Sequence, residues 1–128
     1  AVIEWYRYMN LTGNVKISDS VLRNGGVGLW LESKNVSLDN VQIYDTTHEG
    51  IGGAYYNTTN IKNSLINNNP NDACMVFNFL KGTPIIEGNT FKGCANIAFL
   101  DEPKIPIGEF TSYLRENNDV NTNFLYEY

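Results

Sequence analysis

The feature that most constrains the fold of this chain is a short pattern that occurs four times between residues 14 and 100. Each unit has two mostly apolar residues two positions apart, then Asn, Asp or Gly, then an apolar residue, and then a second Asn, Asp or Gly. Successive units follow at spacings of 21, 23 and 25 residues, which is typical of proteins built from stacked repeats. The equivalent positions are Val15, Val36, Thr59 and Pro84; Ile17, Leu38, Ile61 and Ile86; Asp19, Asn40, Asn63 and Gly88; Leu22, Ile43, Ile66 and Phe91; and Asn24, Asp45, Asn68 and Gly93.

The apolar residues inside each unit recur with a period of two, which indicates β-strands and excludes amphipathic helices. Between the apolar pairs stand residue types that tolerate left-handed backbone conformations and form tight turns. Each unit is therefore expected to bend twice. A third apolar segment closes the units, at residues 27–31, 51–56, 74–79 and 96–100.

Three short strands in a turn of roughly 22 residues predict an all-β fold, a single-stranded right-handed parallel β-helix of about four to five coils. In such a solenoid equivalent positions stack, so the apolar pairs become core columns and the Asn and Asp positions can form side-chain ladders. A leucine-rich horseshoe has a similar period, but its dense leucine and asparagine frame is absent from this chain.

Four segments carry a resemblance to a known family: "NVKISDSVLRN", "NVSLDNVQIYD", "TNIKNSLINN" and "PIIEGNTFKG". With these segments the chain resembles the right-handed parallel β-helix repeats of the pectate-lyase-like superfamily over about residues 14–100. The resemblance implies the fold. It leaves the function open, because the superfamily includes polysaccharide lyases and hydrolases, epimerases, phage tailspikes and non-catalytic surface proteins.

The organisation expected for residues 1–128 is a single β-helix domain that forms part of a larger protein or assembly. Residues 1–13 are interpreted as the final strand and turn of a partial coil, with Met9 at the position of Trp30 in the next coil. Residues 14–100 form the repeat coils, and residues 101–128 form a C-terminal cap or tail.

The C-terminal segment leaves two alternatives open. Ile107, Phe110 and Leu114 recur at three and four residues, which predicts a short capping helix near residues 107–116, with its apolar side on the last coil. An irregular tail packed on that coil is the alternative. The final residues, "NTNFLYEY", are predicted to form a short strand.

The composition limits which partners the protein can bind and which chemical states its two cysteines can adopt. A formal net charge of −5 and a pI near 4.7 argue against nucleic acid, and no apolar run is long enough for membrane insertion. Cys74 and Cys94 have no C-x-x-C partner and no histidine at metal-ligand spacing, so neither a metal nor another cofactor is expected. Reduced core thiols are the favoured interpretation, with one disulfide as the alternative.

Aromatic residues recur in or beside the third strand of each unit. If Leu29 and Leu31 point into the core, Trp30 points outward, and a row of such rings would suit stacking against the apolar faces of sugars. Burial of the same rings in the core is the alternative. The candidate ligand-binding residues are Trp30, Tyr55, Tyr56 and Phe79, and the further members of the proposed stripe are Tyr6, Tyr8, Phe77 and Phe99.

The loops before the third strands contain the one arrangement of acids that suggests catalysis. Glu49 follows Asp45 by four residues, and Asp72 follows the equivalent Asn68 by four residues. Neighbouring coils would place these carboxylates roughly 5–10 Å apart, as glycoside hydrolysis requires. His48, the single histidine, lies beside them. The full motifs of polygalacturonases and of calcium-dependent pectate lyases are missing, so enzymatic activity is left open.

The favoured function is that of a non-catalytic carbohydrate-binding or structural β-helix segment of an extracellular, cell-surface or virion-surface protein, similar to a phage tailspike. Its partner would be a polysaccharide or glycan surface. One alternative is a fragment of a polysaccharide hydrolase or lyase, and another is a subunit that assembles with copies of itself through open coil edges. Three N-glycosylation sequons, at Asn10, Asn35 and Asn57, would matter in a glycosylating secretory host.

Overall fold

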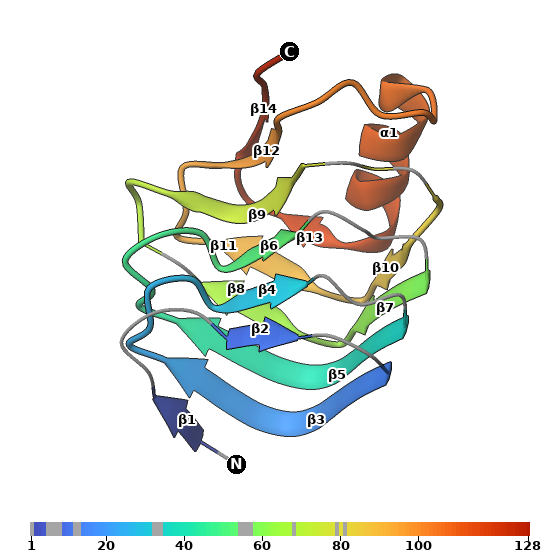
Figure 1. The fold of residues 1–128 in the computed structure, drawn as a ribbon. Coiled ribbons are helices and arrows are strands. Elements are labelled where there is room, and N and C mark those ends of the chain that lie inside the picture. Colours follow the sequence, from blue (N-terminus) through green and yellow to red (C-terminus); the bar gives the residue numbers. More distant parts are fainter. Residues whose placement is uncertain are drawn as a thin grey trace.

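The computed structural model describes residues 2–4, 9–11, 14–31, 35–53, 58–67, 69–78, 80 and 82–128. These residues form a parallel β-solenoid of about four turns with one short helix near the C-terminus. The coils stack from the N-terminal strand at one end to the C-terminal strand at the other (Figure 1). The all-β solenoid predicted from the repeat is therefore confirmed.

The strands lie in two parallel sheets, and every strand pairs with its counterpart in the next coil. The eight-stranded sheet contains β1 (Val2–Glu4), β3 (Asn14–Arg23), β5 (Asn35–Tyr44), β7 (Thr58–Lys62), β8 (Leu65–Asn67), β10 (Ile85–Glu87), β11 (Thr90–Lys92) and β13 (Asp119–Val120). The six-stranded sheet contains β2 (Met9–Leu11), β4 (Leu29–Leu31), β6 (Ile51–Gly53), β9 (Ala73–Phe77), β12 (Asn96–Phe99) and β14 (Asn123–Tyr126). The helix is α1 (Ile107–Asn117).

The first two strand segments of each unit were expected to be separate. In the two earliest complete coils they are continuous, as β3 and β5, and they separate only later, into β7 and β8 and then β10 and β11. The backbone still bends where the repeat predicted. Asp19 and Asn40, in the middle of the two long strands, have φ angles of 51° and 55°. The register of β3 with β5 is the same before the bend, where Ser18 pairs with Asp39, and after it, where Ser20 pairs with Val41.

Positive φ angles occur at nearly all the predicted turn positions. Non-glycine residues rarely adopt this conformation, and Asn and Asp are the types that tolerate it best. Asn68 lies outside the described residues. The positions and angles are Asp19 (51°), Asn24 (61°), Asn40 (55°), Asp45 (54°), Asn63 (53°), Gly88 (71°) and Gly93 (70°).

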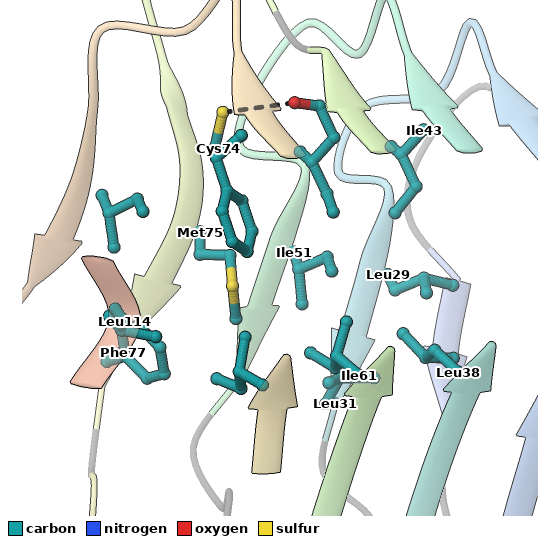
Figure 2. Close-up of a cluster of buried hydrophobic side chains, with 14 of the residues drawn as sticks. Leu29, Leu31, Leu38, Ile43, Ile51, Ile61, Cys74, Met75, Phe77 and Leu114 are labelled. Carbon is teal, nitrogen blue, oxygen red and sulfur yellow. Dashed lines mark hydrogen bonds between the residues drawn. The ribbon is translucent and has the colours of Figure 1, made fainter. Parts of the chain in front are cut away.

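The register of the strands confirms the alignment of the repeat. Leu38 pairs with Ile17 on one side and Ile61 on the other, and Ile61 pairs in turn with Ile86. Leu38, Ile61 and Ile86 are at most 1% exposed, so the column lies in the core. Figure 2 shows Leu38 and Ile61, from the eight-stranded sheet, in the same core as Leu29 and Ile51, from the six-stranded sheet.

The predicted side-chain ladder forms in part. Asn40 Nδ2 donates to Asp19 Oδ1 at 2.8 Å, and Asn35 Nδ2 donates to Asn14 Oδ1 at 2.7 Å, both between neighbouring coils. The next step differs, because Asn63 Nδ2 donates to Asp39 Oδ1 rather than to Asn40.

The N-terminal residues correct two expectations. They contribute two strands, β1 and β2, where one strand and a turn were expected. Met9 pairs with Leu29, and Asn10 pairs with Trp30, so placing Met9 opposite Trp30 was wrong by one residue. Backbone pairing sets the register, and turns of different length change the number of residues between paired positions.

The predicted capping helix is present and covers one edge of the eight-stranded sheet. Phe110 is 3% exposed and Leu114 is fully buried, both in the same core as the coils. Side chains of the cap also satisfy the backbone of β10: the Ile86 N–H donates to the Tyr113 hydroxyl at 2.9 Å, and Asn118 Nδ2 donates to the Ile86 carbonyl oxygen at 2.8 Å. The terminal strand β14 confirms the strand predicted for "NTNFLYEY".

We expect Tyr113→Phe to lower the free energy of unfolding by about 1–2 kcal/mol, because the N–H of the fully buried Ile86 would lose its acceptor. Urea denaturation followed by circular dichroism would measure the change. Tyr128→Phe, at a residue 52% exposed, is the control and should leave stability unchanged.

The same tyrosine predicts a pH dependence. Burial is the main cause that raises the pKa of the Tyr113 hydroxyl above 10.0, and the Glu87 carboxylate raises it further. Because the folded protein keeps this proton to higher pH than the unfolded chain, the stabilising contribution is complete below about pH 10 and is lost as the pH rises through the folded-state pKa. The stability difference between wild type and Tyr113→Phe should therefore narrow above about pH 10.

The two cysteines form a disulfide, so the favoured interpretation as reduced thiols was wrong. The Cys74 and Cys94 sulfur atoms are 2.02 Å apart and their Cα atoms 5.4 Å apart. Their sequence separation of 20 residues is close to one turn of the solenoid, so the two residues meet on neighbouring coils. Cys74 is fully buried in the hydrophobic core (Figure 2).

Candidate functional site

The outward face of the six-stranded sheet changes from bulky to small residues along one column. Leu29 and Leu31 are fully buried and the intervening Trp30 is half-buried, as alternation along β4 predicted. The residues in register with Trp30 on the following coils are Gly52, Val76, Ala98 and Leu125. Three small or medium residues between Trp30 and Leu125 leave a depression in the surface.

This depression is a groove of about 350 Å³, called here the outer groove. Trp30 and Leu125 lie in the same column at positions separated by the smaller Val76 and Ala98, which line the groove between them. Polar groups from the preceding loops and strand ends complete the lining. The lining residues are Trp30, Glu49, Asn71, Asp72, Ala73, Val76, Asn78, Asn96, Ala98, Leu100, Leu125 and Glu127.

Gly52 sets the position of Trp30. A Cβ atom at this residue would lie 2.9 Å from both Cε3 and Cζ3 of Trp30 and 3.1 Å from Oε1 of Glu49. The indole ring therefore lies directly against the backbone of the next coil, with a carboxylate oxygen next to it. A larger residue at position 52 would displace both groups.

Backbone hydrogen bonds place the two candidate acids on neighbouring coils. The Gly28 N–H donates to the Glu49 carbonyl oxygen at 3.1 Å, and the Gly50 N–H donates to the Ala73 carbonyl oxygen, also at 3.1 Å. Glu49 and Asp72 thus belong to adjacent rungs of one ladder, where backbones are about 4.8 Å apart. Both residues line the outer groove, as their equivalent loop positions predicted.

A buried threonine and an asparagine hold the loop that carries Glu49. The Thr46 hydroxyl, 1% exposed, donates to the carbonyl oxygens of His48 (2.8 Å) and Glu49 (3.3 Å). Asn69 Nδ2 donates to the Thr46 carbonyl oxygen at 2.6 Å and links this loop to the next coil. These contacts turn the chain so that Glu49 enters the groove lining.

His48 is not part of this arrangement. It is exposed, it is absent from the residues that line the outer groove, and its backbone N–H donates to the Gly26 carbonyl oxygen at 2.8 Å. Of the three residues predicted to be catalytic, the structure brings two together. In the sequence His48 stands next to Glu49. The spacing does not show, however, on which side of the loop the His48 side chain lies.

The prediction that aromatic rings form an outward-facing row on the third strands was partly wrong. Phe77 and Phe99 are at most 1% exposed and stack on each other inside the core, with ring centroids 5.0 Å apart. They pair in register and, through Gly53, share the inward position of Leu31 rather than the outward position of Trp30. Among the described groove residues Trp30 is the one aromatic side chain. The other expected members, Tyr6, Tyr8, Tyr55, Tyr56 and Phe79, lie outside the described residues.

Several polar residues of the groove were not predicted. Asn78 and Asn96 line it from strand ends, and Glu127 follows the last strand. The Oδ1 atom of Asn78 is buried and has no hydrogen-bond partner among the described residues. These three residues do not occupy the turn positions of the repeat, so the repeat did not single them out. Their positions at the ends of β9, β12 and β14 were the available signal that they lie near one face of the six-stranded sheet.

Metal binding and membrane insertion receive no support from the part of the chain that the structure describes. Within it no cluster of three His, Cys, Asp or Glu side chains could hold a metal ion. The described helix is also too short to cross a bilayer.

Comparison with known proteins identifies the fold family. The family model described as the right handed beta helix region matches residues 8–125. Neither the curated proteins nor the solved structures contain a significant match. The matched segment covers almost the whole chain, and the strand register repeats throughout it. This chain therefore belongs to the right-handed β-helix family.

Proposed function

We propose that this β-helix domain binds glycans in the outer groove. The observation that carries the proposal is the position of Trp30, whose half-buried ring lies against Gly52 and borders a groove lined by carboxylate and amide groups. An indole face suits the apolar face of a sugar ring, and the neighbouring oxygen and amide groups suit its hydroxyls. The rigid sheet below holds these groups in place before the ligand arrives.

The dimensions of the groove favour a short stretch of a glycan chain. Its volume of about 350 Å³ lies at the small end of the range for ligand pockets. The apolar floor of Val76 and Ala98 between polar rims is also typical of such pockets. The domain would hold a few sugar units of a longer polysaccharide.

The disulfide supports an extracellular, cell-surface or virion-surface location. Disulfides persist in oxidising compartments and are rare in the cytosol. Asn35, the one sequon asparagine whose side chain lies among the described residues, is exposed. A surface location would also place the groove in contact with polysaccharides.

The test is the affinity of wild-type protein and Trp30→Ala for a panel of neutral, acidic and basic oligosaccharides, measured by calorimetry. We expect the substitution to weaken binding about tenfold, since an aromatic stacking contact contributes roughly 0.5–1.5 kcal/mol beyond its buried area. Ile85→Ala, at a residue 42% exposed on the eight-stranded sheet, is the control and should bind normally. Equal affinities of wild type and Trp30→Ala would refute the proposal.

Hydrolysis or elimination of a polysaccharide is the second candidate function. It is favoured by the placement of Glu49 and Asp72 on adjacent coils in the same groove. Two carboxylates at such a separation can act as an acid and a base or nucleophile. Release of reducing ends or of unsaturated sugars, abolished by Glu49→Gln or Asp72→Asn, would establish this activity. A polysaccharide panel left intact by the wild-type protein would exclude it for those substrates.

A further inference from the structure

The outer groove carries negative charge that its own lining does not neutralise. Three of the residues that line it are acids, Glu49, Asp72 and Glu127. Among the described lining residues there is no Lys or Arg. A low-dielectric groove lined by one sign of charge concentrates ligands of the opposite sign and repels those of the same sign.

Trp30 and Glu49 lie near the same point of the backbone and together offer the groups that bind an ammonium ion. Both side chains approach the same point on the backbone, with Trp30 ring carbons at 2.9 Å and Glu49 Oε1 at 3.1 Å from where a Cβ of Gly52 would lie. A cation next to this pair would meet the face or edge of an indole and a carboxylate together. Tryptophan is the strongest aromatic partner for a cation, and a charged donor strengthens a hydrogen bond to a carboxylate.

The hydrogen-bonding capacity of the groove also suits a cationic donor. An ammonium group has three donors and no acceptor, so it complements the carboxylates that line the groove. Charge, aromatic contact and hydrogen-bond capacity therefore all point to the same ligand group.

From these three observations we propose that the ligand of the outer groove is a basic glycan, an oligomer of 2-amino-2-deoxyhexose units with protonated amines. The inference rests on the proposed function, because it names the class of glycan that the same groove selects. Uronic acid glycans carry the opposite charge and are repelled by Glu49, Asp72 and Glu127.

The test compares three oligosaccharides of equal length by calorimetry: a β-1,4-linked glucosamine oligomer, its fully N-acetylated counterpart and a galacturonate oligomer. The titrations are made at about pH 5.5, where most of the sugar amines are protonated, and at low salt. We expect the glucosamine oligomer to bind about tenfold more tightly than the N-acetylated one, with the galacturonate oligomer weakest. The preference should shrink as salt is added, because exposed charges are screened.

Variants that remove single charges test whether the preference for the glucosamine oligomer arises in the outer groove. Glu49→Gln and Asp72→Asn should each weaken binding of the glucosamine oligomer about three- to tenfold and weaken binding of the N-acetylated oligomer by a smaller factor, so that the preference between the two narrows. Glu116→Gln, on the exposed side of α1, removes the same charge away from the groove and should change nothing.

The outcomes separate this inference from the proposed function. Equal affinities for the glucosamine and N-acetylated oligomers, or a preference that survives both groove variants, would overturn the inference. If Trp30→Ala still weakened binding, the groove would remain a glycan site of another specificity. Absence of binding to all three oligomers and to the wider panel would overturn both.

Discussion

Replacing Ile61 with aspartate is expected to lower the free energy of unfolding by at least about 4 kcal/mol, a large fraction of the roughly 5–15 kcal/mol that is usual for a domain. Ile61 is fully buried and pairs in register with Leu38 and Ile86, both within the core. The substitution removes apolar contacts and places a carboxylate in the hydrophobic core, between Leu38 and Ile86. The damage would extend to the neighbouring coils, because each coil is stabilised by its contacts with the next.

Ile85→Asp is the matched control for this prediction. It makes the same chemical change in β10, one position from Ile86, at a side chain that is 42% exposed on the outer face. The expected loss is within about 0.5 kcal/mol. Urea titrations followed by circular dichroism would measure both variants. Similar losses for the two substitutions would contradict the inward column of Ile17, Leu38, Ile61 and Ile86.

Loss of the cross-link between Cys74 and Cys94 is expected to cost about 3 kcal/mol. The bond closes a loop with a sequence separation of 20 residues, so it removes conformational entropy from the unfolded chain. It also joins neighbouring coils at the corner that leads into the six-stranded sheet. The double variant Cys74→Ala, Cys94→Ala should unfold at a lower urea concentration than the oxidised protein.

Reduced wild-type protein separates the cross-link from the packing of the sulfur atoms. Reduction opens the bond but keeps both side chains, of which Cys74 is fully buried. Most of the loss should therefore occur on reduction, with a smaller further loss in the double variant because of the cavity left at Cys74. Identical urea midpoints for oxidised and reduced wild type would show that the bond does not stabilise the domain.

The parts of the fold that follow from local rules could be predicted. The alternation of apolar residues predicted the strands, and Asn, Asp and Gly at fixed intervals predicted the bends, where positive φ angles are found at Asp19, Asn40 and Gly88. Equivalent residues such as Leu38 and Ile61 stack because parallel coils leave little freedom of register once one face is buried. The capping helix followed from the spacing of Phe110 and Leu114.

The candidate site could be predicted only in part. The repeat frame placed Glu49 near Asp72 and predicted that Trp30 points outward, and all three residues line the outer groove. It did not exclude His48 from that groove. Nor did it show that Phe77 faces inward, since which residues of β9 point into the core depends on the register with β6 and on the bulge against β12.

The sequence alone determined the architecture of this protein, because alternation of apolar residues and recurrent turn formers act through local backbone geometry that every coil repeats. Only the tertiary structure decided the register of the first coil, the pairing of Cys74 with Cys94 and the outer groove. Each of these depends on distances between segments from different coils. Such distances follow from the lengths of individual turns and from the sizes of individual residues such as Gly52 and Val76. A repeat pattern describes what the coils share and does not contain these differences between them.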